Sequence, residues 1–283
     1  MSTSHLVLAP DATIDLQLHT TYSDGTWTPE QLTDYLVSEQ FGLAAITDHD
    51  RMDTLASLQQ LAAEKKLPLL AAVEISASWK GEPTDVLCYG FDSEQNELSD
   101  VAQDVVRRQG ENTKEVFENL LREGYSFSPD ELPVLLEKPR AQQPHELVAL
   151  LKRHGYGTGE TSPGKIVVGA GCAFATIDIA AVVDAAHRSG AVCLIAHPGR
   201  GDGYIRYDVD LLDQLRQDVP IDGFEVYYPA HTSEQIAMYL EYAQRHHLLT
   251  SSGSDSHGPD KKPIKYRAEQ SRNLLERVGI QVK

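Results

Sequence analysis

Short apolar segments alternate with amphipathic segments in both halves of this 283-residue chain, and this alternation limits the fold most strongly. Strand-like runs that are separated by helix-like runs predict a mostly parallel sheet covered by helices. One helix start is well marked, because Thr28 can cap it, Pro29 suits its first turn and Gln31 completes a capping box. The expected strands are residues 14–18, 43–47, 69–76, 85–91, 191–197, 221–228 and 248–255, and the expected helices are residues 28–40, 54–66, 177–190, 209–218, 233–247 and 268–279.

The middle of the chain has a different pattern. From residue 96 to residue 176 the periods are mainly helical and are broken by prolines, and a glycine-rich stretch at 155–172 predicts a loop. With 41% apolar residues, the chain is able to bury the core of one large domain. We therefore expect an α/β domain made of residues 1–95 and 177–283, interrupted by a small helical insertion at residues 96–176.

The chain is acidic, with 25 Lys and Arg residues against 42 Asp and Glu residues and a formal net charge of -17. Affinity for duplex nucleic acid comes from Lys and Arg residues that release counterions, so we expect no binding of duplex nucleic acid. Hydrolysis of a phosphate ester remains compatible with this charge, because metal ions and a few Arg residues reverse its sign locally.

The N-terminal segment and the cysteines bear on the location of the protein. Residues 1–13 have neither the basic start nor the apolar core of a signal peptide, and no apolar run approaches the ~20 residues that a membrane helix needs. The three cysteines, Cys88, Cys172 and Cys193, lie far apart and form no CxxC pair. They predict buried thiols in a reducing compartment rather than a disulfide framework or a thiolate zinc site. The expected location is the cytoplasm, without a membrane partner.

Potential metal ligands stand at or near the ends of most of the expected strands. In a (β/α) barrel the carboxyl ends of the strands face one common end, so such residues would meet in one place. Imidazole and carboxylate ligands together suit zinc, manganese or iron, and a carboxylate such as Glu74 can bridge two ions. These residues are His19, Asp48, His49, Glu74, His197, Asp255 and His257.

Some of the candidate residues also have a simpler interpretation. Asp24 lies in a Ser-Asp-Gly turn sequence, so a plain turn and a metal ligand are equally favoured. Asp15 and Asp48 suit a role in orienting a ligand rather than in binding a metal. Arg200 is also compatible with a solvated loop, and His145 with a structural position on its helix. The remaining histidines, His5, His154, His187, His246 and His247, are assigned to solvent or to helix ends.

Six segments occur in an order and spacing that resemble one protein family: DLQLHTTYSDG (15–25), AITDHD (45–50), VEIS (73–76), AHPGR (196–200), EVYYPAH (225–231) and GSDSHG (253–258). The chain is similar to the polymerase and histidinol phosphatase (PHP) family of amidohydrolase-like barrels, and most of all to its small stand-alone branch, which hydrolyses nucleotide phosphates and short RNA ends. The resemblance covers the chain except the helical insertion, which that branch also has. It implies a distorted seven-stranded barrel with a cluster of two or three metal ions. In view of the departures described below, we expect one to three ions of manganese, zinc or iron per chain.

The resemblance also implies roles for individual residues. The implied metal ligands are His19, Glu74 and Asp255 for one ion, Glu74 and His197 for a second, and His49, His257 and Asp24 for a third. The residues implied to bind the substrate phosphate are Arg200, His231 and His145.

The sequence departs from the family pattern at three positions. Gln17 stands where the family has the first histidine of its DxHxH motif, and Leu87 stands at the histidine position of H-x-x-G before the insertion. Because a Gln carbonyl oxygen is a weak, neutral ligand and Leu is none, both changes are expected to weaken metal binding. Gln143 replaces an Arg of the family, and Arg140 is close enough in sequence to take its place.

The expected activity is hydrolysis of phosphate esters, either of nucleotides or of short oligonucleotide ends. A metal-bound hydroxide would attack phosphorus, and His197 or His257 would pass a proton to the leaving group. Arg200, together with His231, would hold the non-bridging oxygens as charge builds on them. Two alternatives stay open: a degenerate member that binds a phosphate ligand without turnover, and a hydrolase of another bond, such as an amide.

Overall fold

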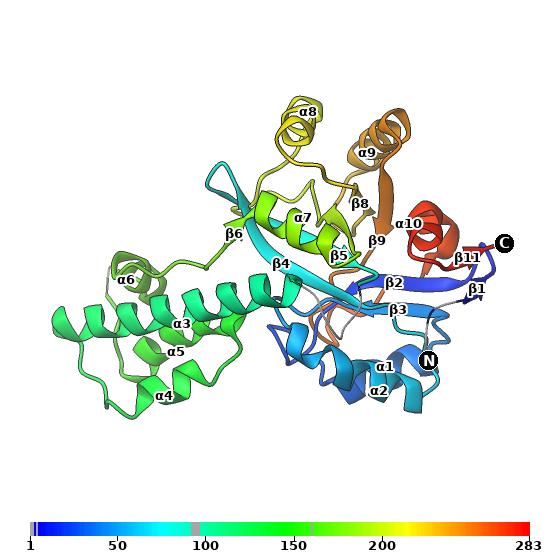
Figure 1. The fold of residues 1–283 in the computed structure, drawn as a ribbon. Helices are drawn as coiled ribbons and strands as arrows, with labels where there is room; N and C mark the ends of the chain where they lie inside the picture. The colour runs from blue at the N-terminus through cyan, green and yellow to red at the C-terminus, as the bar shows by residue number, and fades with distance from the viewer. Residues whose placement is uncertain (1–2, 4, 92–96, 160) are drawn as a thin grey trace. The chain divides into compact units, whose positions relative to one another are not determined.

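A computed structural model describes residues 3, 5–91, 97–159 and 161–283 of the chain (Figure 1). The chain divides into two compact units, one made of Met1–Ala102 with Ile177–Lys283 and the other of Gln103–Thr176. The sequence predicts domain boundaries after residues 95 and 176, and this assignment of domains remains a prediction.

The first unit is built on mixed β-sheets, and its α/β class agrees with the alternation in the sequence. The strands of the largest sheet, in spatial order, are β6 (Ile177–Asp178), β4 (Ala72–Trp79), β5 (Glu82–Tyr89), β7 (Val192–Ile195), β8 (Gly223–Tyr227) and β9 (Leu249–Ser252). A second sheet has the order β10 (Tyr266–Arg267), β2 (Thr13–Leu18) and β3 (Leu43–Ile46), and a third pairs β1 (Val7–Leu8) with β11 (Gln281–Val282).

One strand of the largest sheet, β5, runs against both of its neighbours. It pairs antiparallel with β4 and with β7, whereas β7, β8 and β9 pair parallel with one another. The turn between β4 and β5 contains Lys80 and Gly81, with φ of 52° and 84°. Positive φ at both central residues is typical of the tight turns that join hairpin strands. The start of β5 therefore lies at the same edge of the sheet as the carboxyl ends of β4 and β7.

Isolated bridges join the two larger sheets at two seams. His49, which follows β3, forms a bridge with Glu74 in β4, and Leu18 at the end of β2 forms a bridge with Ser256, which follows β9. In the part of the chain that the structure describes, no continuous ladder of strand pairs closes these seams. Both seams involve segments that carry predicted metal ligands.

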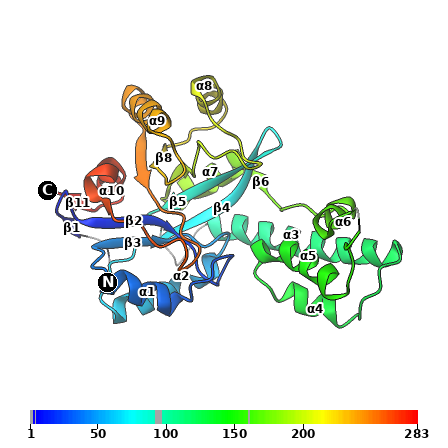
Figure 2. The same ribbon diagram turned by 180° about the vertical axis from the view of Figure 1, so that it is seen from behind.

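Helices cover the sheets of the first unit (Figures 1 and 2). The side chains of Thr28 and Gln31 form the predicted capping box at the start of α1. Helix α7 lies against β4, β5 and β7, and its Val182 and Val183 are fully buried there. The helices are α1 (Pro29–Ser38), α2 (Leu55–Glu64), α7 (Ile179–Arg188), α8 (Val209–Asp218), α9 (Ser233–His246) and α10 (Arg272–Arg277), with 3-10 turns at Met52–Thr54 and Ala268–Ser271.

The second unit is helical, as the sequence predicts for the middle of the chain. It contains most of α3 (Leu98–Arg122), together with α4 (Glu131–Leu136), the 3-10 turn Arg140–Gln142, α5 (Gln143–Arg153) and α6 (Pro163–Gly169). The loop predicted over residues 155–172 is wrong at α6, because Ser162 caps a helix there with Pro163 in its first turn, and Val167 packs into the apolar core. Among the described residues, no helix combines the length and the apolar character needed to cross a membrane.

Candidate metal centre

Histidine and carboxylate side chains from well-separated parts of the chain meet at one edge of the sheets in the first unit. They come from the segments that follow β2, β3, β7 and β9 and from β4 and β5 themselves. Within each of three overlapping groups, the ligand atoms lie within 4.8 Å of one another. The groups are His19, Glu74 and Asp255; His19, Asp24, His49 and His257; and His49, Glu74 and Asp85.

The first group is buried and centred on His19. The Nε2 atom of His19 lies 3.0 Å from Oε2 of Glu74 and 3.3 Å from Oδ1 of Asp255. Among the described residues, neither ring nitrogen of His19 has a well-aligned hydrogen-bond partner. A buried polar atom normally has such a partner, so a nitrogen that faces two carboxylates without one fits a bound cation. The chemistry of this donor set, imidazole with carboxylates, is that of a divalent transition metal site.

The second group contains Asp24, and its geometry favours the ligand interpretation over a plain turn. Oδ1 of Asp24 lies 3.3 Å from Nε2 of His257, and Oδ2 lies 3.9 Å from Nε2 of His49. Gly25 allows this approach, because a Cβ atom at that position would lie 2.7 Å from the backbone carbonyl of His19. The ring of His257 stacks on that of His19 with centroids 4.2 Å apart.

The third group contains Asp85, which the sequence analysis did not single out. Because β5 runs antiparallel, Asp85 near its start lies at the edge where the predicted ligands gather. Its Oδ2 atom lies 3.9 Å from Nε2 of His197, and the same nitrogen lies 3.2 Å from Oε1 of Glu74. The Lys80–Gly81 turn was the available signal, since a two-residue turn between two strand-like runs predicts a hairpin.

The structure explains what the two unusual residues of the sequence do. Leu87 faces Glu74 across the β4–β5 pair but is fully buried in an apolar cluster that includes Leu194, so Asp85 is the side chain of β5 that joins the centre. The Nε2 group of Gln17 donates hydrogen bonds to both carboxylate oxygens of Glu74, at 3.2 and 3.1 Å. Gln17 therefore holds Glu74 in place, in an amide orientation assigned from this hydrogen-bond network.

The charges of the centre are strongly coupled. Burial opposes protonation of His19, but the nearby carboxylates of Asp255 and Glu74 raise the pKa of His19 well above its usual value. Burial also opposes ionisation of Glu74, but the nearby imidazoles of His49, His19 and His197 hold the pKa of Glu74 well below its usual value. For Asp255, neighbouring imidazoles overcome burial and lower the pKa to about 2. Glu74 and Asp255 are therefore ionised, and their negative charge favours the binding of cations.

Two of the candidate ligands have strained backbone conformations. His197 and Asp255 have φ of 31° and 52°, in the left-handed region that few non-glycine residues adopt. The backbone N–H of His197 donates to Glu225, and Oδ1 of Asp15 accepts from the backbone N–H of Ser254 at 2.9 Å. Asp15 thus fixes the backbone beside Asp255 rather than orienting a histidine ring. Strained conformations persist where surrounding contacts impose them, commonly at functional sites.

Asp48 is likewise a structural partner of the ligand loops. Its carboxylate accepts hydrogen bonds from the backbone N–H of Thr20, from the Thr20 hydroxyl and from the Ser23 hydroxyl, each at 2.7 Å. These bonds fix the loop that carries Asp24. The sequence-based role for Asp48 as a supporting residue agrees with this geometry.

The residues predicted to bind phosphate have different surroundings. The guanidinium of Arg200 lies over the ring of Tyr204, 4.6 Å from its centre, and the Arg200 side chain is 29% exposed. His231 uses both ring nitrogens within the protein, because Nδ1 is 2.9 Å from the Val226 carbonyl and Nε2 accepts from the N–H of Gly199 at 3.0 Å. In this state His231 has no nitrogen left for a phosphate oxygen.

His145 lies in the second unit, exposed on α5, with its ring 5.8 Å from that of Phe174. Its role in substrate binding remains a prediction. Gln143 is buried, accepts a hydrogen bond from Thr113 and donates to the carbonyl of Lys138. Arg140 is also buried and donates to the Ala175 carbonyl. Gln143 and Arg140 thus contribute to the packing of the second unit.

Comparison with known proteins identifies relatives that span nearly the whole chain. The chain is 27% identical over 257 residues to the 3',5'-nucleoside bisphosphate phosphatase of Chromobacterium violaceum, with 88% of each chain covered. It is 28% identical over 254 residues to the 5'-3' exoribonuclease Rnm of Salmonella typhimurium, covering 87% of this chain and 85% of the relative. No family model matches the chain.

A solved structure from Bifidobacterium adolescentis, of a protein assigned as a metal-dependent phosphoesterase, superimposes on the chain with a TM-score of 0.73. The two are 26% identical, and the match covers 97% of this chain and 98% of the other. In sequence and in fold, the chain is therefore similar to metal-dependent phosphoesterases.

Proposed function

We propose that the protein is a metal-dependent phosphoesterase that removes phosphate from nucleotides or from the ends of short oligonucleotides. The observation that carries this proposal is the convergence of buried imidazoles and carboxylates from separate segments into overlapping groups of ligand atoms. The two curated relatives described above, a nucleoside bisphosphate phosphatase and an exoribonuclease, support the substrate class. A cytoplasmic location remains a prediction from the sequence.

The fold proposed for this unit is a distorted seven-stranded barrel. The strands β2, β3, β4, β5, β7, β8 and β9 are neighbours in this order, and the isolated bridges at Glu74 and Ser256 would complete the ring. The distortion would lie at these two seams, where the ligand-bearing loops leave the strands.

The ligand set fits one to three divalent ions of manganese, zinc or iron. His19, Glu74 and Asp255 would hold one ion, and His49, His257 and Asp24 another. Glu74, Asp85 and His197 would hold a further ion, with Asp85 supplying a charged oxygen ligand. Divalent ions at such a centre supply Lewis acidity, which activates water and neutralises charge on phosphoryl oxygens.

The surrounding residues would bind and orient the phosphate. Arg200 is positioned by Tyr204, whose hydroxyl also hydrogen-bonds with Asp85, so the phosphate-binding side chain and a metal ligand share one partner. A planar guanidinium suits two phosphate oxygens at once. His231 would act on Arg200 indirectly, as a positioning residue that holds the backbone at Gly199.

His197 and His257 are the candidates for passing a proton to the leaving group. The ring of His197 contacts two tyrosine rings, with centroid distances of 5.4 Å to Tyr204 and 5.5 Å to Tyr228, and these contacts restrict its orientation. The His257 side chain is 33% exposed, and its Nδ1 is 2.9 Å from the backbone carbonyl of Asp255. His257 is thus the more accessible of the two to a leaving group.

The test combines metal analysis with hydrolysis assays on the full chain. We expect between one and three divalent ions per chain, and release of phosphate from a nucleoside 3',5'-bisphosphate or a short RNA when manganese is added. Arg200→Gln should raise KM for the nucleotide, whereas Arg245→Gln, an exposed arginine on α9, should not. Tight phosphate binding without turnover would instead support the non-catalytic alternative, and cleavage of amide substrates alone would overturn the proposal.

A further inference from the structure

A second cluster of potential metal ligands lies in the first unit, near the starts of β7 and β8 and away from the ends that carry the metal centre. His187 is in the last turn of α7, Cys193 is in β7, and Asp222 immediately precedes β8. Their ligand atoms all lie within 4.8 Å of one another. The Nε2 atom of His187 is 2.8 Å from Oδ2 of Asp222, and the same oxygen accepts a hydrogen bond from the backbone N–H of Cys193 at 2.8 Å.

We propose that His187, Cys193 and Asp222 form a three-ligand zinc site that is separate from the metal centre. Thiolate, imidazole and carboxylate are all established ligands of Zn²⁺. Zinc bonds of 2.0–2.3 Å place tetrahedral ligand atoms roughly 3.3–3.8 Å apart, so only small side-chain movements are needed. The side chains of His187 and Asp222 are 36% and 24% exposed, which gives the ion a path of entry and leaves the fourth position to water.

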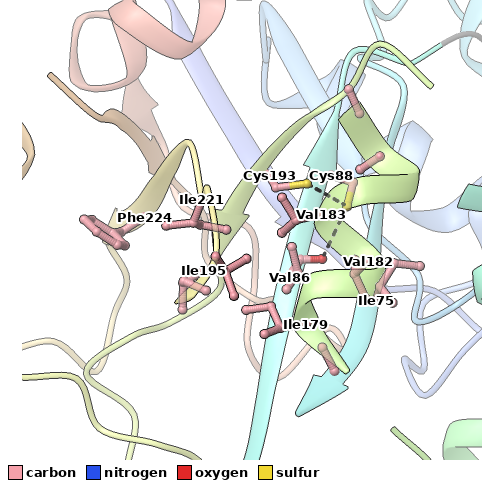
Figure 3. Close-up of a cluster of buried hydrophobic side chains, with 14 of the residues drawn as sticks. Ile75, Val86, Cys88, Ile179, Val182, Val183, Cys193, Ile195, Ile221 and Phe224 are labelled. Carbon is pink, nitrogen blue, oxygen red and sulfur yellow. Dashed lines mark hydrogen bonds between the residues drawn. The ribbon is translucent and has the colours of Figure 1, made fainter. Parts of the chain in front are cut away.

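An ion pair between His187 and Asp222 accounts for only part of this arrangement. The thiol of Cys193 is fully buried beneath α7 and points toward the thiol of Cys88, with the two sulfur atoms 3.8 Å apart (Figure 3). The hydrogen bond with Cys88, burial and the negative charge of Asp222 all raise the pKa of the Cys193 thiol. A divalent cation at the cluster would reverse this effect, because a coordinating thiol is deprotonated.

The site would contribute to stability rather than to hydrolysis. It joins the end of α7 to β7 and to the segment before β8, three parts of the chain that otherwise meet through apolar contacts and hydrogen bonds. The zinc-binding energy adds to the folding energy when the ligands converge only in the folded state. The inference does not depend on the proposed hydrolysis, since a protein without phosphoesterase activity could still bind zinc here.

Cobalt absorption spectroscopy on the full chain separates the two sites. The groups of the metal centre contain only histidine and carboxylate ligands, so a thiolate-to-cobalt charge-transfer band reports on the second cluster alone. We expect this band to appear in the natural sequence, to disappear in Cys193→Ser and to persist in Cys172→Ser, which removes a thiol of the second unit. Absence of the band in the natural sequence, or its persistence in Cys193→Ser, would overturn the proposal.

A substitution at the half-exposed histidine covers the case in which Cys193→Ser does not fold. His187→Gln should lower cobalt affinity at the thiolate band by at least about tenfold, while phosphoesterase activity is unchanged. His154→Gln is the matched control, because His154 pairs with Glu131 at 3.0 Å and is 34% exposed but has no cysteine in its cluster among the described residues. Equal cobalt affinity in the natural sequence and His187→Gln would contradict the site.

Discussion

Glu74 on β4 and Leu87 on β5 face each other across one strand pair, yet they belong to regions of opposite character. Glu74 belongs to the ligand layer, defined here as His19, Asp24, His49, Glu74, Asp85, His197, Asp255 and His257. Leu87 belongs to the apolar layer, defined here as Ala72, Leu87, Tyr89, Val192 and Leu194. The two layers share strands and lie two or three positions apart along them.

Residues that stabilise the fold and residues that are candidates for metal binding therefore lie very close together on the same strands. In the apolar layer, complete burial of hydrocarbon favours the folded state. In the ligand layer, charged groups are removed from water, and His197 and Asp255 adopt left-handed backbone conformations that cost of order 1–3 kcal/mol each. Substitutions in the apolar layer should therefore affect folding, and those in the ligand layer should affect metal binding.

The largest effect is expected at Glu74, which belongs to two of the ligand groups. Glu74→Gln removes the negative charge that faces His19, His49 and His197 while keeping the shape of the side chain. Metal affinity should fall by more than roughly 100-fold, and phosphoesterase activity should fall with it. Isothermal titration with manganese measures the change. Glu82→Gln, on the exposed start of β5, is the control and should bind metal normally.

The second prediction compares one residue from each layer on the same strand, β5. Leu87→Ala should lower the free energy of unfolding by about 2–5 kcal/mol through loss of buried hydrocarbon, with little change in the number of bound ions. Asp85→Asn should lower metal affinity by about 10–100-fold with a much smaller effect on the stability of the metal-free protein. Urea denaturation and metal titration of both variants check the pair. Loss of bound metal in Leu87→Ala, or unchanged metal affinity in Asp85→Asn, would contradict the separate roles of the two layers.

The ligand layer could be predicted from the sequence to the extent that each ligand follows an apolar run. His19, His49, His197 and Asp255 stand just after strands, so their convergence follows once the strands are parallel neighbours. Asp85 could not be assigned in this way, because the direction of β5 is set by the Lys80–Gly81 turn and not by its apolar period.

Other features depend on contacts between distant residues and leave no local signal. The sequence gives no indication that both ring nitrogens of His231 are occupied, since one partner, Gly199, is 32 residues away. The cluster of His187, Cys193 and Asp222 is equally hidden, because its spacing matches no zinc motif. Helix α6 was missed for another reason: the glycines around it favour a loop, and its start depends on the Ser162 cap.

The smallest predicted effect is at His231, a residue close to the ligand layer that should behave like a structural one. Burial lowers the pKa of His231 below the usual 6.5, partly offset by its hydrogen bond with the Val226 carbonyl. Between the lowered pKa and 6.5, the unfolded chain binds more protons at this position than the folded chain. The stability contributed by His231 is therefore complete above pH 6.5 and decreases as the pH falls below that value.

Thermal unfolding of the metal-free protein at about pH 7.5 and about pH 5.5 measures this contribution. The natural sequence should lose more stability than His231→Gln over this interval, because glutamine does not titrate. The histidines of the ligand layer are present in both proteins, so the difference between the two isolates the contribution of His231. An identical pH dependence would mean that His231 is free to take up a proton in the folded protein. In that case its Nε2 would no longer be committed to Gly199, and a direct role in binding the substrate phosphate would regain support.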